Sequence, residues 1–129
     1  MGKKILVVDD DPRIRLFVVT VLEQHQYLPL EASNGQEGME LIRQDRPDLV
    51  ILDILLPKRS GVRMYRELKT DAAFKNIPVV ILSGMREKAF TEAQEVLDEF
   101  DGSKIPKPEA YLEKPVEPDE LAEVIKTVL

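Results

Sequence analysis

The sequence predicts an α/β fold in which five parallel strands form one sheet with helices on both faces. Three apolar runs, at 5–8, 49–52 and 79–82, are too short for helices and rich in β-branched residues, as in strands buried on both faces. Amphipathic helical periods fill the intervals between these runs. The chain of 129 residues, 43% hydrophobic and 33% charged, has the length of one domain with its own core.

The first strand and the first helix follow directly from the N-terminal sequence. After the apolar run at 5–8, Asp11 and Pro12 predict a helix start, with a carboxylate at the N-cap and proline at the first helical position. The helix then carries one apolar stripe, formed by Ile14, Phe17, Val18, Val21 and Leu22.

The second strand is expected at 27–32 and contains Pro29. Proline cannot donate a hydrogen bond to a sheet ladder, so this strand should lie at an edge of the sheet. Ser33 and Gln36 form a capping-box pattern that predicts the start of the second helix. Its apolar positions are Met39, Leu41 and Ile42.

The C-terminal half is expected to hold three helices and, after the strand at 49–52, strands at 79–82 and 111–113. The first of these helices starts at Ser60 and Gly61 and has the apolar positions Met64, Tyr65 and Leu68. The second has the apolar positions Phe90, Ala93, Leu97 and Phe100. The third starts at Pro118 and has the apolar positions Leu121, Val124, Ile125 and Val128. The interval from Ser83 to Lys114 is long and includes a segment, 101–108, with the composition of a surface loop. That segment is either a partner-specific surface or a tolerated insertion.

Strict alternation of strands and helices predicts right-handed crossovers and a parallel sheet. With five strands, the expected fold is a flavodoxin-like, doubly wound sheet of order 2-1-3-4-5. This order puts the strand containing Pro29 at an edge. Residues 1–129 are expected to form a single domain.

The composition excludes several classes of function. The 18 basic and 24 acidic residues give a net charge of −6, which disfavours direct binding to nucleic acid because that requires a basic face. The absence of cysteine excludes disulfides and thiol chemistry. The longest apolar runs are four residues, so no membrane span is expected, and the first run ends in aspartates, unlike a secretory signal. A cytoplasmic location is therefore expected.

Acidic residues gather at the expected ligand-binding edge of this sheet. In an open α/β sheet, ligands bind beyond the carboxyl ends of the strands where the strand order reverses, here between strands 1 and 3. Asp9, Asp10 and Asp11 end the first strand, and Asp53 ends the third. Clustered carboxylates repel each other unless they share a proton or a cation, and oxygen ligands favour Mg²⁺. Helix capping is the alternative role, and it suits Asp11 better than Asp53.

Two more polar residues follow the other strands at the same edge. Ser83 comes directly after the strand at 79–82 and offers a hydroxyl. Lys114 follows the strand at 111–113 and offers a point charge for a carboxylate or a phosphoryl group. A lone serine or lysine is usually a surface residue, but beside the acidic cluster the two complete a specific constellation.

These residues closely resemble the receiver domain of bacterial two-component response regulators, of the kind found in chemotaxis, over essentially the whole chain. The resemblance is carried by the segments 4–12, 53–57 with Gly61, 82–84 and 114–115. It implies that Asp53 accepts a phosphoryl group and that Asp9, Asp10, Asp53 and the backbone carbonyl of Leu55 hold Mg²⁺.

The resemblance also implies a switch. Ser83 would bond the phosphoryl group, Lys114 would be aimed into the site by a cis bond to Pro115, and Tyr111 would fill the space that Ser83 vacates. The affected surface comprises the fourth helix, the fifth strand and the fifth helix. The implied partners are a sensor histidine kinase or a phosphotransfer protein and a downstream protein target, with a phosphorylation-dependent homodimer left open. The domain would be no enzyme beyond catalysing its own phosphorylation and dephosphorylation.

Three other functions were weighed against this one. An aspartyl-phosphate phosphatase of the haloacid dehalogenase type needs an acid/base aspartate two residues after the nucleophile, where this chain has Leu55. A flavodoxin-type flavin carrier needs a phosphate loop after strand 1, where the aspartates at 9–11 would repel the flavin phosphate. A receiver that only binds protein, without phosphorylation, is disfavoured because all five residues of the constellation are present: Asp9, Asp10, Asp53, Ser83 and Lys114.

Overall fold

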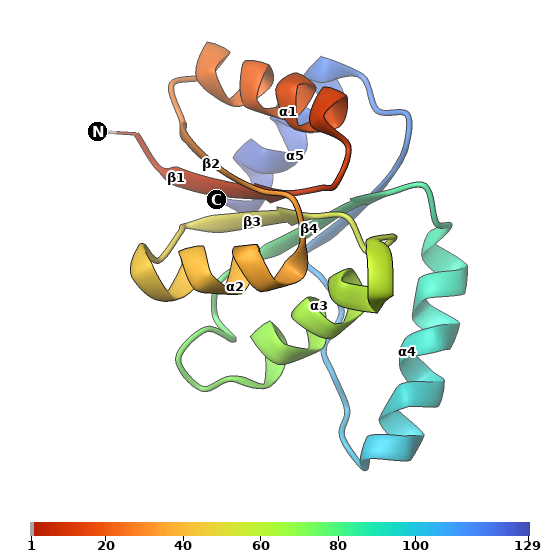
Figure 1. Ribbon diagram of the computed structural model, residues 1–129. Coiled ribbons are helices and arrows are strands. Elements are labelled where there is room, and N and C mark those ends of the chain that lie inside the picture. Colours follow the sequence, from red (N-terminus) through yellow and green to blue (C-terminus); the bar gives the residue numbers. More distant parts are fainter. Residues whose placement is uncertain (1) are drawn as a thin grey trace.

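The computed structural model describes residues 2–129, with residue 59 described by its backbone alone, and strands alternate with helices along it (Figure 1). The strands are β1 Lys4–Val8, β2 Leu28–Ala32, β3 Leu49–Leu52, β4 Val79–Ser83 and β5 Ala110–Glu113. The helices are α1 Pro12–Gln24, α2 Gly35–Gln44, α3 Ser60–Thr70, α4 Glu87–Asp101 and α5 Pro118–Val128, and a short 3₁₀ turn, η1 Pro57–Arg59, precedes α3. No helix in residues 2–129 combines the length and apolar character needed to span a membrane.

All strand pairs are parallel, and the order in the sheet is β2-β1-β3-β4-β5, which confirms the flavodoxin-like prediction. β2 lies at an edge, where Pro29 stands opposite Ile5. Every residue of β3 and β4 is buried, as the continuous apolar runs predict for central strands. The carboxyl ends of the five strands therefore meet at one edge of the sheet.

Helices cover both faces of the sheet (Figure 1). Alternate residues of each strand point to opposite faces, so Ile5 and Val7 pack with α1 and α5, while Leu6 and Val8 pack with α2 and α3. The α1 and α5 side is completed by Val18, Leu22, Leu121 and Ile125, and the α2 and α3 side by Met39, Ile42, Met64, Tyr65 and Leu68. Figure 1 shows α4 beside α3, and Phe90 of α4 is buried in the core on the α2 and α3 side.

The start of α2 differs from the expected Ser33 and Gln36 capping pair. The N-cap is Asn34, whose side chain accepts a hydrogen bond from the Glu37 backbone N–H at 2.9 Å. The Glu37 carboxylate in turn accepts from the Ser33 backbone N–H at 2.8 Å. Asn34 and Glu37 therefore cap the helix in place of Ser33 and Gln36, and a carboxylate in the first turn also interacts favourably with the positive end of the helix dipole.

The apolar stripe predicted for α4 is partly wrong. Phe90 is buried, but Ala93 is exposed and Phe100 is 85% exposed. Polar residues take the inward face instead, because the Arg66 guanidinium of α3 contacts Gln94 Oε1 at 2.8 Å and Asp98 Oδ1 at 3.0 Å. A basic partner on α3 thus makes a polar face of α4 the buried one.

The segment between α4 and β5 is attached to α3 rather than free. The Tyr65 hydroxyl donates to the Pro106 carbonyl at 2.5 Å, and the buried Lys69 ammonium donates to the Glu109 carboxylate at 2.8 Å. Gly102, at a φ of 67°, caps the end of α4 in the left-handed conformation that glycine adopts without strain. The long interval therefore consists of a helix and an anchored return segment.

Candidate functional site

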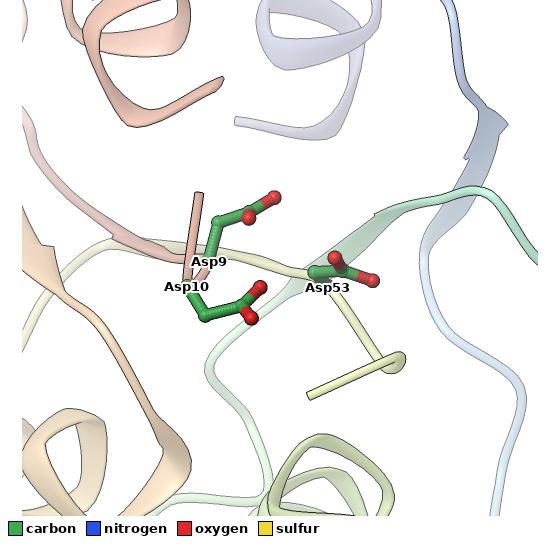
Figure 2. Close-up of side chains that lie close together, drawn as sticks. All are labelled: Asp9, Asp10 and Asp53. Atoms are coloured by element: carbon green, nitrogen blue, oxygen red, sulfur yellow. The ribbon is translucent and has the colours of Figure 1, made fainter. Parts of the chain in front are cut away.

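The acidic residues predicted at the switch point do come together. Val8 stands opposite Leu52 in the sheet, so the residues that follow them leave β1 and β3 side by side. Carboxylate oxygens of Asp9, Asp10 and Asp53 lie within 4.8 Å of one another (Figure 2). Asp11 is not part of this cluster, because its side chain caps α1 by accepting from the Arg13 backbone N–H at 2.9 Å.

Two of the three carboxylates are buried and held by backbone donors. Asp9 is 2% exposed and its Oδ1 accepts from the Asp11 N–H at 2.9 Å. Asp53 is 5% exposed and its Oδ1 accepts from the Leu55 N–H at 2.9 Å. Asp10 is exposed, and no hydrogen bond to its carboxylate occurs among the described residues. The cluster thus combines two oriented carboxylates with one that faces solvent.

Lys114 joins the buried carboxylates. Its Nζ donates to Asp9 Oδ2 at 2.9 Å and to Asp53 Oδ2 at 3.1 Å. The backbone N–H of Lys114 donates to the Ser83 carbonyl at 2.8 Å, and the bond to Pro115 is cis, as the family resemblance implies. The fold therefore brings Lys114, which follows β5, to the carboxylates that follow β1 and β3.

The pKa values in the cluster reflect both burial and pairing. Burial raises the pKa of Asp9 above its ordinary value, because desolvation outweighs the hydrogen bond from Lys114. Burial alone would lower the pKa of Lys114, but the hydrogen bonds to Asp9 and Asp53 outweigh it and raise that pKa. The carboxylates thus keep the lysine charged, while one ammonium does not fully offset the burial of Asp9.

The donor set fits a hard divalent cation. The cluster offers three carboxyl groups and Lys114 supplies one positive charge, so the carboxyl groups outnumber the ammonium. Oxygen ligands with an exposed Asp10 suit Mg²⁺, which keeps several water ligands when bound to protein. The part that the Leu55 carbonyl plays in this coordination stays a prediction.

Ser83 and Tyr111 meet at the backbone of a residue that the sequence did not single out for the switch. Ser83 is fully buried, and its Oγ accepts from the Met85 N–H at 3.3 Å. The Tyr111 hydroxyl donates to the Met85 carbonyl at 2.6 Å. The Tyr111 ring lies against Phe90 of α4 with ring centroids 5.5 Å apart, and burial raises its pKa to about 12. The backbone of Met85 therefore connects Ser83, at the end of β4, with Tyr111 of β5.

Arg15 is a second residue missed in the sequence. Its Nη1 donates to the Asp9 carbonyl at 2.7 Å, and its Nε lies 3.4 Å from a carboxylate oxygen of Glu31. It braces the turn that carries Asp9 and Asp10. An arginine on the first turn of a helix gives no signal by itself, because most such side chains point to solvent.

Gly61 positions the other half of the cluster. A Cβ at this residue would lie 2.5 Å from the Asp53 carbonyl and 2.6 Å from Ile54 Cα. The start of α3 can therefore approach the turn after Asp53 only because residue 61 has no side chain. This close approach gives a physical reason for the glycine that contributed to the family resemblance.

The structure is that of a doubly wound α/β domain with an acidic cluster and a paired lysine at its switch point. The family model described as the response regulator receiver domain matches residues 5–126. The chain belongs to this family, so it is a signalling domain of two-component systems. The phosphatase and the phosphorylation-independent binding module are not favoured.

Curated relatives agree with the family. The chain is 35% identical over 126 residues to Protein PilH of Pseudomonas aeruginosa, covering 98% of this chain and 97% of that protein. It is also 35% identical over 129 residues to the phosphate regulon transcriptional regulatory protein PhoB of Escherichia coli, covering 100% of this chain and 52% of PhoB. The chain thus spans nearly all of one relative and about half of the other.

Solved structures share the fold. The chemotaxis response regulator CheY4 of Vibrio cholerae superposes with a TM-score of 0.82 at 23% identity, covering 100% of both chains. The N-terminal domain of a response regulator receiver protein from Methanoculleus marisnigri gives a TM-score of 0.68 at 35% identity, covering 98% of this chain and 96% of that one. The strand order predicted from the sequence is therefore that of solved receivers.

Proposed function

We propose that Asp53 is the phosphoacceptor of this domain and that the donor is a phosphohistidine on a sensor histidine kinase or a phosphotransfer protein. The observation that carries the proposal is the Lys114 ammonium, 3.1 Å from Asp53 Oδ2 within the acidic cluster. A phosphoryl group on that oxygen would lie within reach of a fixed positive charge. Asp9, Asp10, Asp53 and the Leu55 carbonyl would hold Mg²⁺.

The transfer needs positioning more than it needs a base. An Asp53 oxygen attacks the phosphorus in line with the P–N bond of the donor, and a new O–P bond forms as the P–N bond breaks. The electron pair of that bond stays on the imidazole nitrogen, which leaves as a neutral ring when its other nitrogen carries a proton. The nucleophile is already an anion, so no protein base takes part. Lys114 offsets charge on the phosphoryl oxygens, and Mg²⁺, when bound, supplies further positive charge there.

Intact mass after incubation with acetyl phosphate tests this assignment. We expect one added phosphoryl group with Mg²⁺ and none with excess chelator. Asp53→Asn should abolish the gain, because an amide is not a competent nucleophile. Asp11→Asn is the matched control, since Asp11 caps α1 outside the cluster and asparagine caps equally well. Undiminished labelling of Asp53→Asn would refute the assignment.

Phosphorylation of Asp53 would reach the surface through Met85. To bond the phosphoryl oxygens, the Ser83 hydroxyl would leave the Met85 N–H, from which it accepts a hydrogen bond at 3.3 Å. The Met85 carbonyl also holds the Tyr111 hydroxyl, so a shift of this backbone would free the ring beside Phe90. The packing of α4, β5 and α5 would then change, and this surface would bind the downstream target.

Beryllofluoride, a stable mimic of the phosphoryl group, tests the switch by NMR. Backbone shifts should change at Met85 and Tyr111 in the wild type. In Tyr111→Phe, which loses the hydroxyl bonded to Met85, the changes at Met85 should persist while those in α4 shrink. Changes in α4 that are identical in both proteins would contradict this route. Sedimentation of the same samples decides whether the modified domain forms a homodimer.

A further inference from the structure

One face of α4 carries an apolar stripe that lies open to solvent. Ala89, Ala93, Val96 and Phe100 are spaced i, i+4, i+7 and i+11, so they share one side of the helix. All four are exposed, and the two largest, Val96 and Phe100, are 54% and 85% exposed. Isolated exposed apolar residues need no explanation, but a helix-length row of them is typical of a contact surface.

The stripe is separate from the part of α4 that faces β5. A groove between α4 and the return segment 104–108 is lined at its base by the buried Phe90 and Gln94 and reaches Tyr111. Its other lining residues on the helix are Glu87, Thr91, Glu95 and Asp98. At 100° per residue, these four helix positions lie on the opposite side of the buried Phe90 from the stripe. A partner on the stripe would therefore leave the groove and Tyr111 uncovered.

The charge of α4 indicates what kind of partner fits the stripe. The helix carries one basic residue, Lys88, against six acidic ones: Glu87, Glu92, Glu95, Asp98, Glu99 and Asp101. Arg66 pairs with Asp98 and Asp101, which leaves Glu92 and Glu99 among the exposed carboxylates. These two are seven residues apart and border the stripe along one edge.

Self-association through this face is disfavoured for the same reason. Two copies of α4 packed along their stripes would bring like charges together in a region of lowered dielectric, which opposes association. The whole chain has a net charge of −6, so the repulsion is not limited to the helix.

We propose that the stripe on α4 is a docking site for a basic amphipathic helix of another protein. The partner would place apolar side chains on Val96 and Phe100 and lysine or arginine beside Glu92 and Glu99. The stripe lies on the side of Phe90 away from Tyr111, so the protein can hold this partner while the surface beside β5 engages another. The site extends the domain beyond its proposed phosphoacceptor function to a second protein contact.

Two synthetic helical peptides test the proposal by fluorescence anisotropy. Both carry leucine at i, i+4, i+7 and i+11, one with flanking lysines and the other with flanking glutamates. We expect the lysine peptide alone to bind, more weakly as salt rises. Phe100→Ser should weaken binding about tenfold or more, because Phe100 is the largest and most exposed apolar side chain of the stripe. Leu16→Ser, at a residue of α1 that is 67% exposed, is the matched control and should bind normally.

Charge reversal completes the test. Glu92→Lys with Glu99→Lys should lose the lysine peptide and gain the glutamate peptide, while melting curves by circular dichroism confirm that all variants fold. Equal binding of Phe100→Ser and wild type, equal binding of the two peptides, or no binding of either peptide would overturn the proposal. Sedimentation of the free protein as a dimer that Phe100→Ser dissociates would overturn it in favour of a second copy as occupant.

Discussion

Replacing Lys114 by methionine removes the ammonium from the acidic cluster while keeping most of the apolar stem. Asp9 and Asp53 would remain buried, at 2% and 5% exposed, without the charge that contacts both. We therefore expect the metal-free variant to be less stable than the wild type near neutral pH, because an uncompensated buried charge is costly.

The size of the loss follows from burial. Breaking a fully buried ion pair costs about 3–5 kcal/mol. The Lys114 side chain is 23% exposed, so solvent screens the interaction, and we expect a loss near the lower end, about 3 kcal/mol. For a domain of this size that corresponds to a melting temperature lower by about 10 °C.

The loss should depend on pH in a definite direction. Asp9 already has a pKa above its ordinary value of 3.8, and without Lys114 that pKa rises further. A raised carboxyl pKa means that the folded protein holds the proton more tightly than the unfolded chain does, so stability is retained at low pH and lost as the pH rises through the folded pKa. The variant should therefore approach the wild type on acidification and differ most at neutral pH.

Urea unfolding with chelator present, at about pH 7 and about pH 4.5, measures both effects. Lys4→Met is the control, because its pair with Asp45 is exposed, at 42% and 44%, and solvent screens it, so its loss should change the stability little. Adding Mg²⁺ should restore part of the stability of Lys114→Met at pH 7. This account of the cluster would be refuted if Lys114→Met were no less stable than Lys4→Met, or if it lost the same free energy of unfolding at both pH values.

Three other changes are expected to have measurable effects. Arg66→Ala should lower the free energy of unfolding by about 2 kcal/mol, because three acceptors of α4 lose their donor. In the same urea titration, replacing the exposed Arg63 by alanine should change the free energy of unfolding by no more than about 0.5 kcal/mol. Asp10→Ala should keep or raise metal-free stability, since it relieves repulsion. It should also abolish the stabilisation by Mg²⁺, which in the wild type adds about 2.7 kcal/mol to the free energy of unfolding at a hundredfold excess over Kd and raises the melting temperature. A wild type whose melting temperature is insensitive to millimolar Mg²⁺ would refute the metal site. The half-exposed Leu55 cannot orient a water for attack on the acyl phosphate, so the phosphorylated wild type should lose its phosphoryl group slowly after donor removal and Leu55→Asn should lose it faster, as measured by intact mass. Met85 packs against the core, so a polar residue at that position would be a poorer probe. An unchanged rate of loss in Leu55→Asn would count against the idea.

Much of the fold was accessible from the sequence because central parallel strands have a simple requirement. They are buried on both faces, so each must be a continuous apolar run, and the runs at 49–52 and 79–82 could hardly be anything else. Pro29 fixed the edge for an equally local reason, since it lacks a backbone donor.

Helix details were less accessible where two local solutions are close in energy. Ser33 and Asn34 are both good N-caps, and the position of Glu37 decided between them. In α4, two apolar faces compete, one through Phe90 and one through Val96 and Phe100. Arg66, far away in the sequence, decided the outcome by giving Gln94 and Asp98 partners in the interior.

The sequence by itself determined that Asp9, Asp10, Asp53, Ser83 and Lys114 would lie at one edge of the sheet, because parallel strands joined by helices all end on the same side. Only the tertiary structure decided which of these groups touch. The Lys114 ammonium bridges Asp9 across 105 residues of sequence, and Ser83 reaches Tyr111 through the backbone of Met85. Hydrogen bonds depend on tenths of an ångström, and no periodicity or spacing in a sequence specifies distances between side chains that only the packed sheet and helices bring together.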